Sequence, residues 1–226
     1  MKTKYGAHDE VYRARRADGK PGWQDPESLK ETLAGLAGKM TSVHAPQSGR
    51  TLELGCGAGD LSLFLAEAGY DVHGVDIAPT AIDWAREKAV ERGLQARFQV
   101  GSVLELADFR DGYFDLVLDG YCFHCIIGPD RARFLASAWR VLKPGAILHV
   151  ATMCGEVTSA SLRAKLDPES RCVLDQDGVA TRYIGLPEDI LTEVRTAGFQ
   201  VLEWKVKPRM DAESDMDELL VWAARD

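Results

Sequence analysis

A glycine-rich turn between a short apolar strand and a helix constrains the fold of this chain more than any other feature. Residues 52–60 read LELGCGAGD. Glycine tolerates positive φ and allows a ligand to approach the backbone closely. A strand, such a turn and a helix form the first half of a βαβ unit, in which ligands bind beyond the carboxyl ends of the strands. The turn therefore predicts an α/β fold with a ligand site at that edge of the sheet.

Apolar runs typical of buried strands alternate with helical patterns through most of the chain. The expected strands cover residues 51–54, 70–75, 97–100, 114–118, 146–151, 199–206 and 219–223. The expected helices cover residues 26–40, 60–68, 79–92, 131–142 and 187–198, and the motif 143–145 (KPG) is expected to stop the fourth of them. This alternation predicts a doubly wound, mostly parallel seven-stranded sheet with helices on both faces and an antiparallel hairpin at one edge.

The regular pattern occupies one domain, residues 25–226, and two segments depart from it. Residues 1–24 are polar and mixed in charge, and we expect them to form a helical lid or appendage. Residues 153–186 have no regular period, and we expect an insertion that covers the substrate over the carboxyl ends of the strands. Aromatic and basic side chains suited to cover a ligand occur in the first segment: Tyr5, Tyr12, Arg15, Arg16 and Trp23.

Composition narrows the classes of partner. The chain has 27 Lys and Arg against 35 Asp and Glu, a net charge of −8, which disfavours general binding to nucleic acids or membrane surfaces. No apolar run approaches the roughly 20 residues of a membrane span, and the first ten residues lack the apolar core of a secretion signal. Five cysteines at irregular spacing do not form a disulfide framework. We expect a cytoplasmic monomer or homodimer that acts on a small molecule.

The charge around the turn indicates which ligand it holds. Glu53 and Asp60 flank the glycines, Asp76 ends the second strand, and no Lys or Arg occurs between residues 51 and 71. Two carboxylates beside a pyrophosphate would be repulsive by about 1 kcal/mol or more each at an effective dielectric near 20. A dinucleotide-binding turn has a small residue where Asp60 stands, and a Walker A loop would need Gly-Lys-Ser/Thr. The site therefore favours a nucleoside that carries positive charge.

Five ordered motifs resemble those of the class I S-adenosylmethionine-dependent methyltransferases. They are ELGCGAG at 53–59, GVDI at 74–77, GSV at 101–103, FDLVLD at 114–119 and LKPG at 142–145. The resemblance covers about residues 50–150. It implies a methyltransferase that uses S-adenosylmethionine, an adenosine with a sulfonium and an ammonium group, and methylates a small-molecule acceptor.

The resemblance also implies a set of cofactor-binding residues: Glu53, Gly55, Cys56, Gly57, Gly59, Asp76, Ile77, Ser102, Val103 and Asp119. The glycines would pack against the methionine and ribose portions. Glu53 would lie near the ammonium, Asp76 would hold the ribose hydroxyls, and Ile77 would pack on the adenine. Ser102 and the backbone after it would face the adenine edge, where many relatives have aspartate. Asp119 would lie near the methionine end.

Methyl transfer from a sulfonium is an in-line displacement, so the protein must align the reactants and exclude water. The segment DGYCFHC, residues 119–125, follows the fourth strand. His124 is the candidate base, because its pKa of about 6.5 suits proton transfer near neutrality, and Tyr121 is expected to orient the acceptor. The candidate substrate-binding residues are Tyr12, Trp23, Tyr121, His124 and Arg182. The Pro-Pro-Tyr turn of nucleobase amino-methyltransferases is absent, which disfavours that substrate class.

Three alternatives stay open. The first is a metalloid or thiol methyltransferase that uses Cys122 and Cys125, with further thiols from Cys154 and Cys172 in the insertion. One CxxC motif is weak evidence for a metal, and no metal is assigned. A nicotinamide-dependent oxidoreductase is disfavoured by Asp60 and the acidic turn. A protein that binds S-adenosylmethionine without catalysis is the third.

Overall fold

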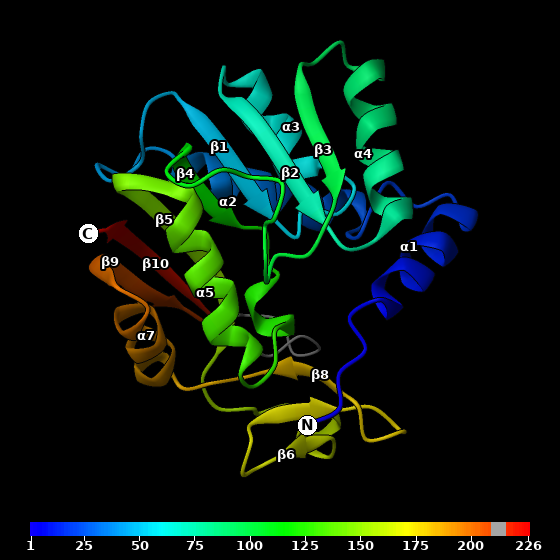
Figure 1. Ribbon diagram of the computed structural model, residues 1–226. Coiled ribbons are helices and arrows are strands. Elements are labelled where there is room, and N and C mark those ends of the chain that lie inside the picture. The colour runs from blue at the N-terminus through cyan, green and yellow to red at the C-terminus, as the bar shows by residue number, and fades with distance from the viewer. Residues whose placement is uncertain (209–215) are drawn as a thin grey trace.

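A computed structural model describes residues 1–208 and 216–226, and its centre is a seven-stranded sheet in the order β3-β2-β1-β4-β5-β10-β9 (Figure 1). Its strands are β1 Arg50–Leu54, β2 Asp71–Asp76, β3 Ala96–Val100, β4 Phe114–Asp119, β5 Leu142–Cys154, β9 Phe199–Lys207 and β10 Asp217–Arg225. The first five are parallel, and β10 runs antiparallel to both β5 and β9. The expected fold class is confirmed, including the antiparallel hairpin at the edge.

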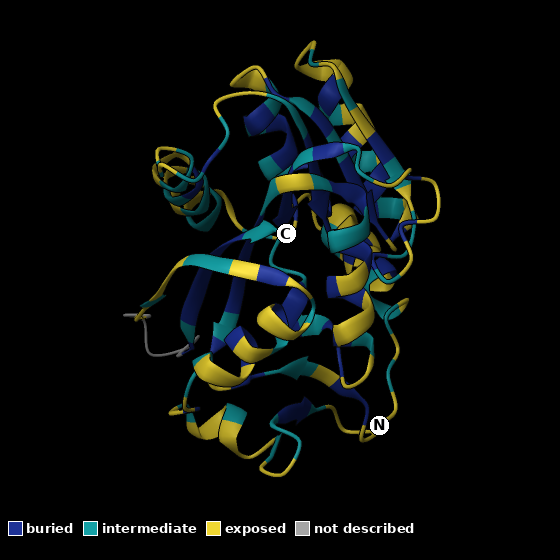
Figure 2. Cartoon of the chain, turned by 60° about the vertical axis from the view of Figure 1, so that its left-hand side comes forward, coloured by how far each residue is buried: buried dark blue, intermediate teal, exposed yellow. Residues whose placement is uncertain are grey.

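Helices cover both faces of the sheet, because successive strand residues point to opposite sides. The helices are α1 Ala7–Ala17, α2 Pro26–Lys39, α3 Asp60–Glu67, α4 Pro79–Glu91, α5 Asp130–Val141, α6 Ala160–Arg163 and α7 Pro187–Thr196, with a 3-10 turn η1 at Phe123–Cys125. Apolar residues of α5 and α7 pack with one set of strand side chains, and those of α2, α3 and α4 pack with the other. The central strands are accordingly buried, while much of the edge strand β9 and of the outer helix surfaces is exposed (Figure 2).

One expected boundary is wrong. The motif at 143–145 was expected to separate a helix from a strand that begins at 146, but α5 ends at Val141 and β5 already begins at Leu142. Leu142 pairs with Phe114, whereas the next pair joins Ile147 to Leu116, so the motif forms a bulge within β5. Such a bulge inserts residues that have no partner on the neighbouring strand, and the strand continues beyond it.

The two irregular segments lie at the carboxyl edge of the sheet. Residues beyond β5 form a separate antiparallel sheet of β6 Leu166–Asp167, β7 Cys172–Leu174 and β8 Ala180–Tyr183. The N-terminal segment starts beside β8, where the Ala180 amide donates to the Lys2 carbonyl at 3.0 Å, and runs to α1 beside α4 (Figure 1). Both segments are thus next to the strand ends at which the site was expected. None of the helices in the described ranges combines the length and the apolar character that crossing a membrane requires.

Candidate active site

The glycine turn between β1 and α3 is closely packed. The amides of Gly55 and Cys56 donate to the Val75 carbonyl at 2.8 and 3.0 Å, which ties the turn to β2. Gly55 and Gly57 have φ of +70° and +51°. A Cβ at Gly55 would lie 2.5 Å from the Cβ of Cys122, and one at Gly57 would collide with the Tyr12 hydroxyl. Both glycines are therefore required by backbone conformation and by space.

Asp76, at the end of β2, is held by the turn itself. One carboxylate oxygen accepts from the Gly57 amide at 2.9 Å and the other from the Ala78 amide at 2.8 Å. Burial raises the pKa of Asp76, and the two amide donors act in the opposite direction. The carboxylate is therefore fixed beside the glycines, as the sequence predicted, with its role toward ribose still a prediction.

Two further buried carboxyl groups flank the same turn. Glu53 is 1% exposed, accepts from the Ser62 hydroxyl at 2.5 Å, and burial raises its pKa to about 8. Asp119 is 3% exposed and accepts from the amides of Cys122 and Phe123 at 2.8 and 2.9 Å, and burial raises its pKa to about 7. No basic side chain of the described residues forms an ion pair with Glu53, Asp76 or Asp119. A cation bound here would stabilise their ionised forms.

Asp60, unlike these three carboxyl groups, has a basic side chain as its partner. Its carboxylate forms an ion pair of 2.6 Å with Lys88 of α4, and the backbone at Gly22 packs against it. Sequence reasoning counted Asp60 among the free acids, because Lys88 is 28 positions away and reaches it only through the packing of α4 on α3. The carboxyl groups of the site that have no ion-pair partner among the described residues are Glu53, Asp76 and Asp119 instead.

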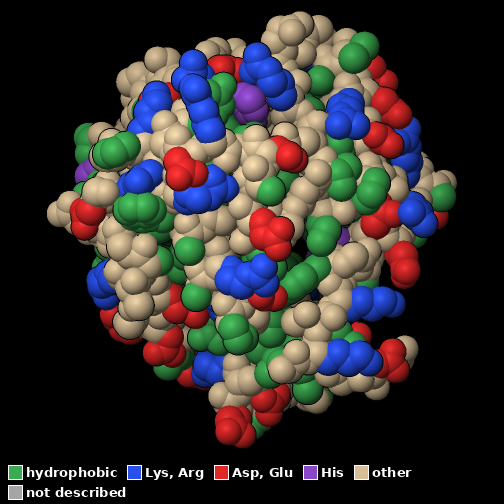
Figure 3. Space-filling view, in the orientation of Figure 1, with side chains coloured by type: hydrophobic (Ala, Val, Ile, Leu, Met, Phe, Trp, Pro, Cys, Tyr) green, Lys and Arg blue, Asp and Glu red, His purple; other side chains and the backbone are tan. Residues whose placement is uncertain are grey.

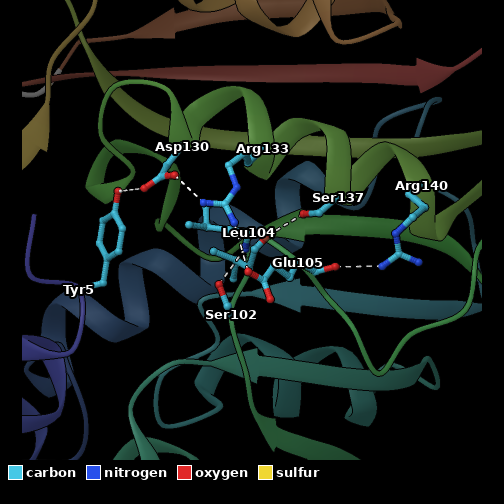
Figure 4. A network of polar contacts seen from close by, with 9 residues as sticks. Tyr5, Ser102, Leu104, Glu105, Asp130, Arg133, Ser137 and Arg140 are labelled. Atoms are coloured by element: carbon cyan, nitrogen blue, oxygen red, sulfur yellow. Dashed lines mark hydrogen bonds and ion pairs between the residues drawn. The ribbon is translucent and has the colours of Figure 1, made fainter.

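The loop after β3 is anchored to α5 (Figure 4). Ser137 donates to the Val103 carbonyl at 2.5 Å, and Arg140 donates to the carbonyls of Glu105 and Leu106 at 3.0 and 2.9 Å. The Ser102 hydroxyl accepts from the Leu104 amide at 3.2 Å, and so it shapes the loop.

The sequence placed the adenine edge at this loop. The Gly101 amide donates to the Asp76 carbonyl at 2.9 Å, which holds the start of the loop next to the end of β2. Ile77, the expected adenine contact, is 39% exposed just beyond β2. An apolar side chain left this open can pack on an adenine ring.

The segment after β4 carries the two candidate catalytic residues. Tyr121 has φ of +61°, a conformation that side-chain-bearing residues rarely adopt and that is typical of functional loops. Its hydroxyl accepts from the Lys39 ammonium of α2 at 3.2 Å. His124 is 6% exposed within η1. Arg131 of α5 fixes this turn, because its guanidinium donates to the carbonyls of Phe123 and Ile126, which bracket His124, at 2.8 and 3.2 Å.

The N-terminal segment covers the glycine turn. Tyr12 is 6% exposed, and its ring lies 5.3 Å from that of Trp23 and over Gly57. Asp9 accepts from the Thr80 amide at the start of α4 at 2.8 Å. The segment is also tied to the opposite side of the site, where the Tyr5 hydroxyl donates to Asp130 at 3.0 Å (Figure 4). The structure therefore brings Tyr12 and Trp23 to the turn, whereas Arg182 lies on β8 in the small sheet.

The cysteines are free thiols with little tendency to ionise. Burial raises the pKa of Cys122 well above its usual value, that of Cys125 to about 11 and that of Cys154 to about 12. Metal and metalloid ligation requires the thiolate. Over residues 1–208 and 216–226 no group of three or more His, Cys, Asp or Glu side chains is arranged to hold a metal ion. The geometry thus gives the metalloid alternative no support.

Sequence reasoning missed several residues of this edge: Asp9, Lys39, Lys88 and Arg131. Asp9, Lys39 and Lys88 act through contacts with distant parts of the chain, and Arg131 joins the η1 turn to Glu193 of α7. A helical Lys or Arg in the sequence carries no signal that distinguishes such a contact from a solvated charge.

Comparison with known proteins agrees with this geometry. Residues 52–150 match the family described as "Methyltransferase domain". The chain is 32% identical over 136 residues to a ubiquinone biosynthesis O-methyltransferase of Methylococcus capsulatus, covering 58% of this chain and 56% of the relative. It is 36% identical over 126 residues to a 2-heptyl-1-hydroxyquinolin-4(1H)-one methyltransferase of Mycobacteroides abscessus, covering 55% and 51%. The chain thus spans about half the length of these curated relatives.

Among solved structures, the fold is similar to that of the 1,6-didemethyltoxoflavin-N1-methyltransferase of Burkholderia thailandensis, which was crystallised with 1,6-didemethyltoxoflavin and S-adenosylhomocysteine. The TM-score is 0.68 at 23% identity, over 96% of this chain and 86% of that one. At this identity the likeness concerns the fold. Together with the motifs, the matched domain shows that residues 52–150 are similar to a methyltransferase domain, set in a fold shared with a solved methyltransferase.

Proposed function

We propose that this protein is an S-adenosylmethionine-dependent methyltransferase that methylates a hydroxyl group of a small-molecule acceptor. The observation that carries the proposal is the group of three buried carboxyl groups around the glycine turn, Glu53, Asp76 and Asp119. A cationic nucleoside fits such a site, and a pyrophosphate does not. The O-methyltransferase named among the relatives supports oxygen as the methylated atom.

The chain supplies a partner for each part of the cofactor. Asp76 would accept from the ribose hydroxyls, Glu53 and Asp119 would face the ammonium and sulfonium end, and Ile77 with the anchored loop after β3 would hold the adenine. When bound, S-adenosylmethionine supplies an electrophilic methyl group. Tyr12 and Trp23 would close the site above the glycines, because the N-terminal segment already packs there. We infer that residues 1–24 act as the lid.

Methylation of a hydroxyl group also requires a general base that accepts the hydroxyl proton. An acceptor hydroxyl that takes the methyl group would lose its proton, while the bond from sulfur to the methyl group breaks and the thioether leaves as S-adenosylhomocysteine. His124 would accept that proton, and Arg131 would keep the turn that carries His124 in place. Tyr121 would orient the acceptor. Exclusion of water by the lid would favour transfer to the acceptor over side reactions.

The surface and the thiols agree with a small-molecule acceptor in a reducing compartment. On the face seen in Figure 3, basic and acidic side chains are interspersed rather than gathered into one basic patch. The five cysteines are free. These features support the expected cytoplasmic location, which stays a prediction, as does the monomeric or homodimeric state.

A screen of small hydroxylated acceptors tests the proposal. The enzyme would be incubated with S-adenosylmethionine and each acceptor, and release of S-adenosylhomocysteine would be measured against the Asp76→Ala variant as background. We expect acceptor-dependent release by the natural protein. A protein that binds S-adenosylhomocysteine but turns over no acceptor of the panel would instead support the non-catalytic alternative.

A further inference from the structure

Strand β8 of the small sheet, which packs against η1, carries Arg182. Arg182 pairs in register with Val173 of β7, so the two side chains leave the same face of that sheet. Val173 packs in an apolar cluster with Met153 near the end of β5. This face of β8 is therefore turned toward the carboxyl end of β5, and β8 also lies against η1, which follows β4.

The charge of Arg182 acts on the η1 turn. Burial raises the pKa of the Cys125 thiol to about 11, and the Arg182 guanidinium is the charge that opposes this rise. Cys125 is the neighbour of His124 in η1. Because β8 packs against η1 and the face of β8 that carries Arg182 packs toward Met153, Arg182 lies on a strand that borders the ends of β4 and β5, where the proposed function places the acceptor.

Arg182 differs from the other arginines of this region. Arg163 and Arg171 donate to backbone carbonyl oxygens within the insertion, and Arg131 forms an ion pair of 2.6 Å with Glu193. Arg182 is half-buried, and no oxygen atom of the described ranges accepts a hydrogen bond from it or forms an ion pair with it. Its N–H donors are therefore available to a ligand.

We infer that Arg182 binds an anionic group of the methyl acceptor, so that the acceptor is a small acid with a carboxylate or phosphate near the methylated hydroxyl. This inference rests on the proposed function. The planar guanidinium presents parallel N–H donors that match the two oxygens of such a group. The three buried carboxyl groups would hold the cationic cofactor on one side, and Arg182 would hold the anionic acceptor on the other.

Matched pairs of probes test this assignment by calorimetry. Protein saturated with S-adenosylhomocysteine would be titrated with protocatechuate and its methyl ester, and with phenyl phosphate and phenol. The same titrations would use Arg182→Gln, Arg182→Lys and, as a control of equal charge change, Arg195→Gln at an exposed position of α7. Affinity for S-adenosylhomocysteine would be measured for every variant.

We expect at least one acid to bind about 10-fold or more tighter than its neutral partner, as for a charged hydrogen-bonded pair. Arg182→Gln should abolish this preference, Arg182→Lys should keep part of it, and Arg195→Gln should keep all of it, with unchanged affinity for S-adenosylhomocysteine throughout. If S-adenosylhomocysteine binds but every acid binds no better than its neutral partner, or if Arg182→Gln keeps the preference, the inference is overturned while the proposed function stands. Failure of S-adenosylhomocysteine to bind the natural protein would refute the proposed function itself.

Discussion

At the scale of residues, the glycine turn was predictable because its constraint is local. Gly55 and Gly57 have positive φ, which follows from the sharp turn itself. The lack of room for a Cβ at these glycines comes from Cys122 and Tyr12, which lie far away in the sequence. The charge of the site was only partly predictable. Asp60 and Lys88 pair across 28 positions, so the sequence overstated the acidity contributed by Asp60. The position of Asp119 at the end of β4 was predictable from the strand pattern, since the carboxyl ends of parallel strands share one edge.

Substitution of Asp76 tests the cofactor geometry. We expect Asp76→Ala to weaken binding of S-adenosylmethionine by about 1–3 kcal/mol, because it removes charge-assisted acceptors and leaves two amides without their partner. Isothermal titration calorimetry would measure the change. Asp71→Ala, at the exposed start of the same strand, is the matched control and should bind normally. Equal affinities for the two variants would contradict the placement of ribose at Asp76.

His124 is assigned to the chemical step rather than to cofactor binding. His124→Ala should therefore lower kcat by about 10²- to 10⁴-fold, the usual contribution of a general base, with little change in affinity for S-adenosylhomocysteine. Steady-state kinetics on an acceptor found in the screen would measure kcat. His44→Ala, outside the site, should keep the natural rate. A natural rate in His124→Ala would remove this residue from the chemistry.

At the scale of elements, the order of helices and strands followed from hydrophobic period, and the bulge inside β5 did not. A Lys-Pro-Gly motif after a helix is a strong turn signal, and only pairing with β4 makes it part of a strand. The attachment of α1 and α2 also depends on distant partners. Lys39 at the end of α2 reaches Glu218 on β10 across 179 positions, which no local pattern reveals.

The pair that fastens α2 to the sheet gives a test of stability. Lys39 and Glu218 are 3.4 Å apart, with side chains 12% and 10% exposed. Lys39→Met should lower the free energy of unfolding by about 3 kcal/mol, because it leaves a buried carboxylate without its cation. Urea denaturation would measure the loss, and Lys39→Met combined with Glu218→Gln should recover most of it.

The more exposed pair of Lys143 and Asp115 provides the comparison, with side chains 38% and 31% exposed. Lys143→Met should cost about 1 kcal/mol or less, because solvent screens an exposed pair. If both single variants lose the same stability, the pair of Lys39 and Glu218 does not fasten α2 in the way described.

At the scale of the whole molecule, the sheet gathers ionisable groups at one edge, and this makes stability depend on pH. Burial raises the pKa of Glu53 to about 8 and that of Asp119 to about 7, above the values of about 4 expected in the unfolded chain. At pH values between the unfolded-state and the folded-state pKa, each of these two carboxyl groups is protonated in the folded protein and ionised in the unfolded chain. The contribution of these two groups to the free energy of unfolding therefore falls as pH rises from about 5 to about 8. Burial lowers the pKa of His149 to about 3, so His149 contributes in the opposite direction below about pH 6.5.

Urea denaturation of the unliganded protein at several pH values would measure this fall. Glu53→Gln removes one of the two groups, so its free energy of unfolding should fall less steeply over the same interval. Saturating S-adenosylmethionine should also reduce the fall in the natural protein, because a bound cation stabilises the ionised carboxylates. Identical slopes for the natural protein and Glu53→Gln would show that Glu53 does not hold a proton in the folded state.

The sequence predicted which edge of the sheet carries the site, but it did not predict how that edge is covered. Tyr12 reaches Gly57 only because Asp9 fixes α1 to the start of α4, and Tyr5 fixes the other end of the segment to Asp130. These contacts join parts of the chain that lie far apart in sequence.

The central claim is that the acidic glycine turn binds a cationic nucleoside and rejects an anionic one. Calorimetric titration of the natural protein with S-adenosylmethionine and, separately, with NAD⁺ tests this claim most directly. We predict binding of S-adenosylmethionine at one site per chain and no binding of NAD⁺ at that site. Binding of NAD⁺ that displaces S-adenosylmethionine would contradict the claim.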